Sequence, residues 1–585
     1  MYVRKSKNNN GRIYLSIVQG YRDELGKAKQ RTIEKLGYLD DLEKLYDDPY
    51  AHFSAIAKKR TKEEVVPDLI IKLSEKLSPQ TNNRKNLGYS VLQKIYNELS
   101  IGEFFQEKQR KTDVSFNLNS IFRLLVYSRI LKPGSKQANF NNRESFFENF
   151  KFSLKDIYRS LSHFNACKEE LQSYLHKRIK ELYGRNTDVA YYDCTNYYFE
   201  IGHNDEDTYQ FDETGEVCLD EEGNPILLEV GLRKKGPSKE NKKSPIVQMG
   251  LLMDNDGLPM AYHLFPGNES EKTSLNPILS KTKRSFELDK VIIVADRGLN
   301  TSDNIFYNKR ELDGYVFSQT VKGADKEFKT YALKDEDFVD CSDGSRYKWR
   351  VKSKDIQIMR NGKRTCKINV IQKQVIIYSE KYAERARHER EKILQKAEEL
   401  IANPGTYTKA TSHGAAGYVK NLAFDKDTGE IIEKDLSIDW EKIREEEAYD
   451  GYYAIVTSEL EKSPEEIREI YRGLWKIEES FKITKSDFEA RPVYVSKKEH
   501  IEAHFFICFV SLLILRLLEK KLNGKYSVRQ IIDTLNNYSC SHLQDNYFIF
   551  DYRNELIEDI EQIFNIDLSH KIMSRKKIKE ILSNV

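Results

Sequence analysis

Three acidic residues, Asp193, Asp296 and Glu478, carry the most specific chemical information in this sequence. Asp193 lies in the middle of the segment Asp188 to Glu200, whose aromatic and β-branched residues predict a strand. Asp296 follows the apolar run Val291 to Ala295 and precedes a glycine break, which predicts the carboxyl end of a buried strand. Ligand sites in open α/β sheets lie at such strand ends.

Carboxylates at these places suit a hard cation, because Mg²⁺ prefers oxygen ligands and keeps several of its waters. Two such ions can promote in-line displacement at a phosphodiester. Structural roles remain open for each residue taken singly. Asp193 could pair with a lysine, and Asp296 could cap the next helix or pair with Arg297.

Glu478 falls on a predicted helix from Ser463 to Lys485, which opens with a Ser463/Glu466 capping box. Helical spacing places a core stripe beside a semi-polar one. The core stripe holds Ile470, Leu474, Ile477 and Phe481, and the semi-polar stripe holds Tyr471, Trp475, Glu478, Lys482 and Lys485. Trp475 borders the core and is expected to pack there, with base stacking as the alternative. Glu479, rotated by about 100°, should face solvent. An ordinary amphipathic helix with ion pairs one turn apart is the alternative interpretation.

The elements between the two aspartates predict how they meet. Strands at Ile246 to Met253 and Pro259 to Phe265 flank an Asp-Gly turn, and a helix near Ser270 to Ser285 leads into the Asp296 strand. This order of strand, hairpin, helix and strand is that of an RNase H-like core. Because the first strand and the strand after the helix are neighbours in such a core, Asp193 and Asp296 should come together.

At these residues the chain resembles the DDE transposases of bacterial insertion sequences, in the branch with a Tyr-x2-Arg-x3-Glu-x6-Lys signature. Tyr471, Glu478 and Lys485 keep the spacing, but Leu474 occupies the arginine position and Arg472 lies two residues earlier. The blocks YYDCTNYYFE, VIIVADRGLNT and ARPVYVSKKEHIEAHFFICFVSLL also look like those of the family. The resemblance spans roughly Asp188 to Lys520.

The resemblance implies that Asp193, Asp296 and Glu478 are the catalytic residues and bind two Mg²⁺ ions, for which Mn²⁺ can substitute. It implies cleavage at the terminal inverted repeats of the element, strand transfer into target DNA, and a homodimer in the DNA complex. Lys482 and Lys485 should then meet phosphates as point charges, and the Tyr471 hydroxyl could hydrogen-bond one.

Asp296 and Glu478 are 182 positions apart, which requires an insertion between them. Within it, strands are predicted at 315–321, 327–333, 346–351 and 367–378, then a helix at 381–402, and a strand at 452–457 that rejoins the core. In the resembled family this insertion is largely β and holds a strained DNA end. Trp349, flanked by Arg and Lys residues, is the candidate for stacking on a displaced base, with a solvated edge-strand aromatic as the alternative.

The net charge is only +3, so DNA binding must rely on local patches. Residues 1–36 contain nine Lys or Arg against three Asp or Glu and predict a hairpin with strands at 12–19 and 27–36. A second basic run should rim the catalytic groove, although a solvated loop is an equal alternative. It comprises Arg233, Lys234, Lys235, Lys239, Lys242 and Lys243.

Cysteine usage indicates the reducing interior of a cell, and the resemblance implies a cytoplasmic, bacterial, nucleoid-associated protein. The seven cysteines include no C-x2-C pair, so neither a disulfide framework nor a zinc ribbon is expected. No signal peptide opens the chain, and the longest apolar run, Phe505 to Leu518, is too short for a bilayer span and suits a buried helix.

The predicted fold is α/β: an RNase H-like core, a mixed sheet flanked by helices, interrupted by the β insertion. The regions are an N-terminal basic hairpin arm and linker (1–80), a helical DNA-binding region (87–185), the core's first part (186–303), the insertion (304–450), the core's second part (451–521) and C-terminal helices (522–585). Thr81 to Asn86 is predicted to continue the linker. Two alternatives to a transposase remain: an RNase H-like nuclease or resolvase, and a domesticated DNA-binding protein without catalysis.

Overall fold

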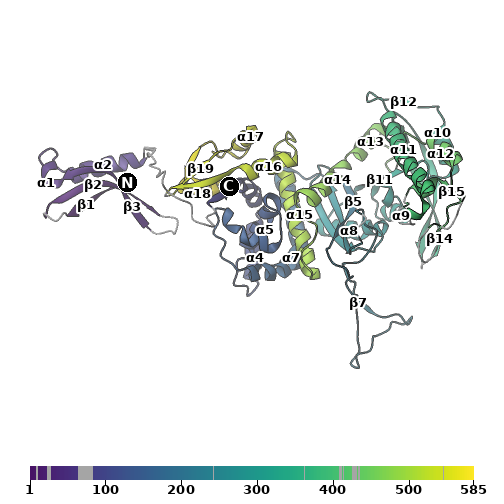
Figure 1. The fold of residues 1–585 in the computed structure, drawn as a ribbon, viewed down its shortest axis with the longest axis horizontal. Helices are drawn as coiled ribbons and strands as arrows, with labels where there is room; N and C mark the ends of the chain where they lie inside the picture. The colour runs from purple at the N-terminus through teal and green to yellow at the C-terminus, as the bar shows by residue number, and fades with distance from the viewer. Residues whose placement is uncertain are drawn as a thin grey trace. The chain divides into compact units, whose positions relative to one another are not determined.

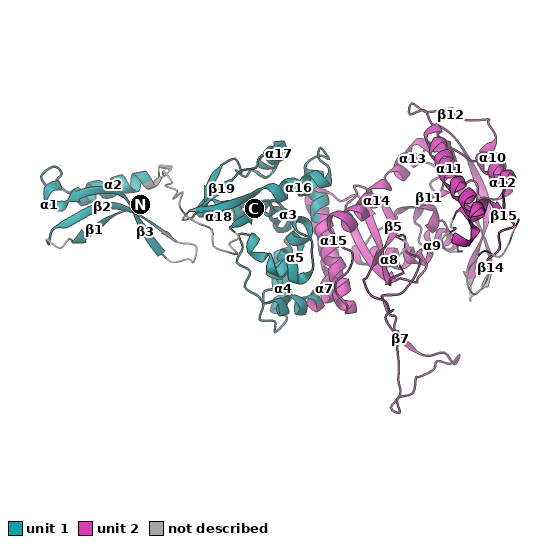
Figure 2. Ribbon diagram, viewed as in Figure 1, with its two compact units in different colours: residues 1–161, 514–585 teal, residues 162–513 magenta. Residues whose placement is uncertain are grey.

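The computed structural model describes residues 1–7, 11–22, 28–62, 83–240, 243–360, 363–407, 412, 414–424, 431, 435–544 and 546–585. Lys27, Lys242 and the linker residues Thr81 and Asn82 lie outside these ranges. The chain forms two compact units (Figure 2). Unit 1 contains Met1–Leu161 and Ile514–Val585, and unit 2 contains Ser162–Leu513.

Unit 2 is built on one mixed sheet of nine strands in the order β12-β13-β14-β17-β11-β10-β5-β8-β9. The elements that come first in its sequence match the predicted ones: β5 (Val189–Tyr198), β8 (Ile246–Asp254), β9 (Pro259–Pro266), α8 (Glu271–Phe286) and β10 (Ile292–Ala295). Strand β10 runs parallel to β5 and pairs Val294 with Tyr191. Two residues further along each strand, Asp296 is therefore level with Asp193, as predicted.

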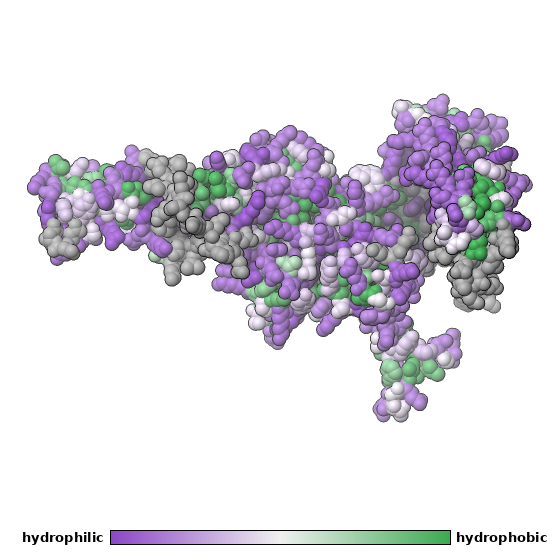
Figure 3. All heavy atoms as spheres, viewed as in Figure 1, coloured by the Kyte–Doolittle hydropathy of each residue, from purple (hydrophilic) through white to green (hydrophobic). Residues whose placement is uncertain are grey.

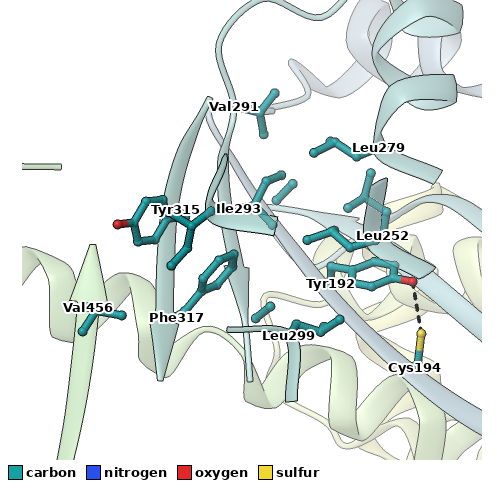
Figure 4. Packing of buried hydrophobic residues seen from close by; sticks show 14 of the residues in the cluster. Tyr192, Cys194, Leu252, Leu279, Val291, Ile293, Leu299, Tyr315, Phe317 and Val456 are labelled. Carbon is teal, nitrogen blue, oxygen red and sulfur yellow. Dashed lines mark hydrogen bonds between the residues drawn. The ribbon is translucent and has the colours of Figure 1, made fainter. Parts of the chain in front are cut away.

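The core of this sheet fixes β5 firmly. Tyr192 is fully buried and donates its hydroxyl to Ser274 Oγ of α8 at 2.7 Å, with Cys194 Sγ 3.1 Å away. Figure 4 shows Tyr192 and Cys194 in the core cluster that also contains Leu252, Ile293 and Phe317. Because side chains alternate along a strand, Tyr192 and Cys194 turn into this core and Asp193 turns to the opposite face.

The long strands of the insertion join the core sheet, whereas β15 (Val419–Lys420) and β16 (Ser437–Ile438) pair with each other in a separate two-stranded sheet. Strand β11 (Gly314–Gln319) pairs with β10, while β13 (Arg346–Arg360) and β14 (Lys363–Tyr378) continue the same sheet through β17 (Tyr452–Thr457). A short strand, β12 (Val339–Asp340), forms the edge. The helix predicted at 381–402 is present as α11 (Glu380–Ala402), on the right of Figure 1.

The strand predicted at 327–333 is wrong, because this segment is helix α10 (Lys326–Leu333). Asp325 caps its start by accepting a hydrogen bond from Phe328 N at 2.9 Å. Phe328 and Ala332, four residues apart, are its buried residues. This spacing fits a helix, but over so short a segment it also fits the alternation of a strand.

The predicted continuous helix from Ser463 to Lys485 is also wrong. The capping box is present, but the segment divides into α13 (Pro464–Arg472), α14 (Trp475–Lys482) and a π-helical turn (Ile483–Asp487). Gly473 lies between the first two, so close to Tyr191 that an added Cβ would collide with the tyrosine hydroxyl. Trp475 is 56% exposed instead of packing in the core, and Ile470 is only half-buried.

Unit 1 begins with a three-stranded sheet, which adds β1 (Tyr2–Lys7) to the predicted hairpin of β2 (Ile13–Arg22) and β3 (Ala28–Tyr38). Helix α2 (Pro49–Lys62) packs on this sheet over buried Leu15 and Ile17. A helical block follows, with α3 (Tyr89–Glu98), α4 (Ile101–Arg110), α5 (Leu118–Leu131) and the start of α7 (Leu154–Tyr183).

Two predictions in this unit need correction. Arg84–Asn86, assigned to the linker, is strand β4 and pairs with β18 (Ser539–Gln544) near the other end of the chain. The C-terminal region is not purely helical, because β18, β19 (Tyr547–Phe550) and β20 (Ile572–Ser574) join β4 in a four-stranded sheet. Helices α16 (Val528–Asn537), α17 (Glu555–Phe564) and α18 (Arg575–Asn584) are present.

Helix α15 (Lys498–Lys521) contains the longest apolar run of the sequence. By length and composition it could cross a membrane, but its apolar window is entirely buried within the protein. The prediction of a buried helix is confirmed.

Candidate active site

Asp193 sits at the centre of the site, half-buried on β5. Its Oδ1 accepts a hydrogen bond from Cys194 N at 2.7 Å. Burial raises the pKa of Asp193 to about 6, an effect that the Lys239 ammonium opposes and that the carboxylates of Glu271 and Asp296 reinforce. Two carboxylates of the predicted triad are therefore close enough to repel one another, and a bound cation would relieve that repulsion.

Asp296 is exposed at the end of β10, and one of its oxygens is already engaged. Oδ1 accepts hydrogen bonds from Arg297 N at 2.6 Å and from Ser318 Oγ at 2.8 Å. Oδ2 accepts none from the described residues. Asp296 therefore does have the capping role considered as an alternative. That role uses Oδ1 and leaves Oδ2 available for another ligand.

Ser318 lies close to Asp296 and to Tyr471 of α13. It lies at the end of β11, where Asn300 Nδ2 donates to its carbonyl at 3.0 Å. Burial raises the pKa of Tyr471 to about 12, with Asp296 and Glu478 contributing in the same direction. The tyrosine therefore lies near two of the three predicted carboxylates.

Glu478 is exposed on α14, whereas its neighbour Glu479 is half-buried, so the expectation that Glu479 faces solvent is not met. Throughout the described ranges, no three His, Cys, Asp or Glu side chains are near enough to hold a metal ion as they stand. Asp193 and Asp296 have the donor chemistry that Mg²⁺ prefers. The three predicted residues must come closer together for all of them to share a metal site.

A cationic group lies beside these carboxylates. Lys239 donates to the Cys194 carbonyl at 2.6 Å and lies 3.4 Å from Glu271. Lys485, in the π-helical turn, is 13% exposed and pairs with Glu240 at 3.2 Å. Burial, together with Lys239, lowers the pKa of Lys485 to about 8. The predicted residues Lys239 and Lys485 therefore meet near Asp193, while Lys482 is exposed to solvent.

Comparison of the sequence with models of known protein families identifies the family of this chain. Residues 227–514 match the transposase DDE domain, and residues 3–66 match the N-terminal domain of IS1634-family transposases. The chain belongs to the DDE transposases of insertion sequences. The DDE match includes Asp296 and Glu478 but begins after Asp193, whose place in the site rests on the β5–β10 register. A DDE domain works with a divalent metal ion.

No curated protein matches the transposase. Among solved structures, a piggyBac transposase synaptic complex with hairpin DNA is 7% identical, with a TM-score of 0.33, and the match covers 85% of this chain and 82% of that one. A Mos1 transposase paired-end complex with the left transposon end is 12% identical, with a TM-score of 0.13, covering 45% and 66%.

Arg472, which was not expected to contact phosphate, and the predicted stacking residue Trp349 make contacts elsewhere in the transposase. Arg472 is tied to Glu469 and to Asp343, each at 2.6 Å. Trp349 is 48% exposed on β13, with Lys373 Nζ 5.0 Å from its ring centre. Pairings across β14 and β17 place Trp349 level with Ser318, on the same face and three strand spacings, about 14 Å, away. Base stacking by Trp349 stays a prediction.

Sequence reasoning missed three residues of the site: Ser318, Glu271 and Glu240. Ser318 follows an apolar strand and could have been found by the rule that sites gather at strand ends. Glu271 is the first residue of α8, and acidic residues are common in the first turn of a helix, so its sequence position does not mark it as part of a site. Glu240 lies within a basic run, where no sequence pattern marks an acid that pairs with two cations, Lys485 and Arg491.

Proposed function

We propose that this transposase catalyses cut-and-paste transposition, by Mg²⁺-dependent cleavage at the ends of its insertion sequence and strand transfer into target DNA, with Asp193, Asp296 and Glu478 as catalytic, metal-binding residues. The observation that carries the assignment is the β5–β10 register, which sets Asp193 level with Asp296 at a strand end. The strand order β9-β8-β5-β10-β11 supports an RNase H-like core, which β17, β14, β13 and β12 extend on one side.

In this proposal the protein's own groups prepare the site. Ser318 and Arg297 N hold Oδ1 of Asp296, which leaves Oδ2 for the metal. When bound, two Mg²⁺ ions supply stabilisation of the attacking and leaving oxygens of the phosphodiester, and Mn²⁺ can replace them. Tyr471, which lies near Asp296 and Glu478, is proposed to contact a phosphate through its hydroxyl.

The cationic residues are proposed to receive DNA. Lys239 and Lys485 lie beside Asp193, and exposed Lys482 follows Glu478 by one turn of α14. Glu240, which now pairs with Lys485 and Arg491, would be displaced by a phosphate. The DNA partners are the terminal inverted repeats and the target, bound by a homodimer in the bacterial cytoplasm, on the nucleoid.

The deciding experiment supplies purified protein with end-containing duplex, target plasmid and Mg²⁺. Excision followed by joining of the cleaved end to the plasmid is expected. Cleavage without joining would favour a nuclease or resolvase, and end binding without cleavage would favour a non-catalytic DNA-binding protein.

A further inference from the structure

Between β5 and β8 the chain leaves the catalytic sheet as a projecting arm, residues 203–230, which carries the label β7 in Figure 1. Tyr198 at the end of β5 pairs with Ile246 at the start of β8, so the two ends of the intervening segment return to the same place. The arm can therefore extend without disturbing the sheet.

The arm has a defined backbone. Its stem pairs β6 (Thr208–Tyr209) with β7 (Leu227–Glu229). Beyond the stem, a ring of backbone hydrogen bonds joins three segments of the arm: Cys218 N to Gln210 O at 2.8 Å, Gln210 N to Ile226 O at 2.9 Å, and Ile226 N to Cys218 O at 2.8 Å. Two tight turns, capped by Asp212 and Asp220, close the tips.

This backbone has almost no core behind it. Phe211 is 57% exposed, Leu219 58% and Leu228 63%, and Val217, Leu227 and Val230 are exposed as well. Figure 3 shows these hydrophobic side chains among hydrophilic ones on the arm. Isolated two-stranded hairpins are marginally stable, and clustered exposed apolar side chains mark interaction surfaces. We infer that the arm is covered in a functional assembly.

The charge of the arm excludes DNA as its cover. From Asp205 to Glu229 the sequence has ten acidic residues and no Lys or Arg. Asp205, Asp207 and Glu229 pair with cations at the base of the arm, and the other seven have no basic partner within the described part of the chain. Phosphates would repel such a surface, and so would a second acidic arm. The partner must be basic and must offer apolar contacts.

We propose that the acidic arm docks on the N-terminal sheet of a second copy of this chain. Residues 1–36 have nine basic residues against three acidic ones, and the sheet exposes Tyr2, Ile13 and Ile33. Its charge and its exposed apolar side chains both complement the arm. The same sheet is proposed to bind DNA, so the arm acts as a DNA mimic that links copies until DNA displaces it. This inference rests on the proposed DNA-binding role of that sheet.

Self-association of the full-length, DNA-free protein tests the proposal directly, separately from cleavage. Sedimentation velocity should show salt-sensitive dimers or larger assemblies that end-containing DNA dissolves. The arm variant combines Glu206→Gln, Glu213→Gln, Glu221→Gln and Glu222→Gln, and a second variant carries Phe211→Ser with Leu228→Ser. Each should weaken self-association by about tenfold or more, because the first removes interface charge and the second removes apolar side chains.

The matched control changes four exposed glutamates elsewhere in unit 2: Glu384→Gln, Glu398→Gln, Glu445→Gln and Glu461→Gln. It should associate like the wild type. A photo-crosslinker at position 228 should react with residues 1–38 of another copy. Monomeric wild-type protein at low salt, equal weakening by the control, or crosslinks only to other surfaces would each overturn the proposal, whatever the cleavage assay shows.

Discussion

At the scale of single residues, the site can be tested by removing one carboxylate at a time. Asp193→Ala, Asp296→Ala and Glu478→Ala should each abolish Mg²⁺-dependent cleavage, because each removes a proposed metal ligand, while end binding in gel shifts stays near wild type. Glu479→Ala should cleave well. An active Glu478→Ala protein beside an inactive Glu479→Ala protein would show that the wrong glutamate has been assigned.

Ser318→Ala tests how Asp296 is positioned. Loss of the 2.8 Å hydrogen bond should free the Asp296 carboxylate to rotate and weaken metal binding about 10- to 100-fold, the range for groups that orient a metal ligand. Mn²⁺ binding followed by electron paramagnetic resonance measures this without any reaction. Ser318→Thr keeps the hydroxyl and should restore affinity. If Ser318→Ala bound Mn²⁺ like the wild type, the hydrogen bond would have no positioning role.

Lys485 and Arg472 provide a comparison between two basic residues of one segment. Lys485 lies beside Asp193, whereas Arg472 is held by Asp343 and Glu469. Lys485→Ala should therefore cost far more cleavage than Arg472→Ala. Cleavage rates are compared between variants whose melting temperatures are equal, so that a loss of stability does not explain a loss of activity. Equal losses would place the phosphate contacts on the Arg472 side.

At the scale of elements, much of the core was predictable from residue pattern alone. The aromatic segment around Asp193, the Asp-Gly hairpin and the apolar run before Asp296 each specify their own strand, and the buried Leu474 follows from helical phase. The close approach of Gly473 to Tyr191 was not predictable, because Tyr191 lies on a strand distant in the sequence. The same holds for β13 and β14, whose pairing with the core sheet depends on β17.

Gly473→Ala follows from that close approach. A methyl group at this position would collide with the Tyr191 ring, so the variant should lose about 1–3 kcal/mol of unfolding free energy and displace α14 with its Glu478. Gly405→Ala is the matched control, since an added Cβ there meets no atom within 4 Å. Thermal unfolding and cleavage rate are measured on both. Unchanged stability of Gly473→Ala would mean that Tyr191 moves aside and that the close approach has no steric consequence.

At the scale of the whole molecule, DNA affinity should depend on local charge, because the net charge is only +3. The triple variant Arg4→Ala, Lys7→Ala and Lys35→Ala removes three cations from the N-terminal sheet. For every phosphate that these side chains neutralise in the wild type, the slope of log affinity against log salt should fall by about 0.9. Full-length protein is titrated with end DNA at several salt concentrations. A slope equal to that of the wild type would remove the N-terminal sheet from the DNA interface.

Unit 1 is assembled from both ends of the chain, since Arg84 on β4 contacts Ser539 on β18 across 455 positions. During synthesis at about 5–20 residues per second, β4 leaves the ribosome roughly 20 to 90 seconds before its partner strand exists. Unit 2 emerges whole in that interval. A nascent or prematurely terminated transposase would therefore carry the DDE fold while the four-stranded sheet of unit 1 is still incomplete, so the last strands made determine when the molecule becomes whole.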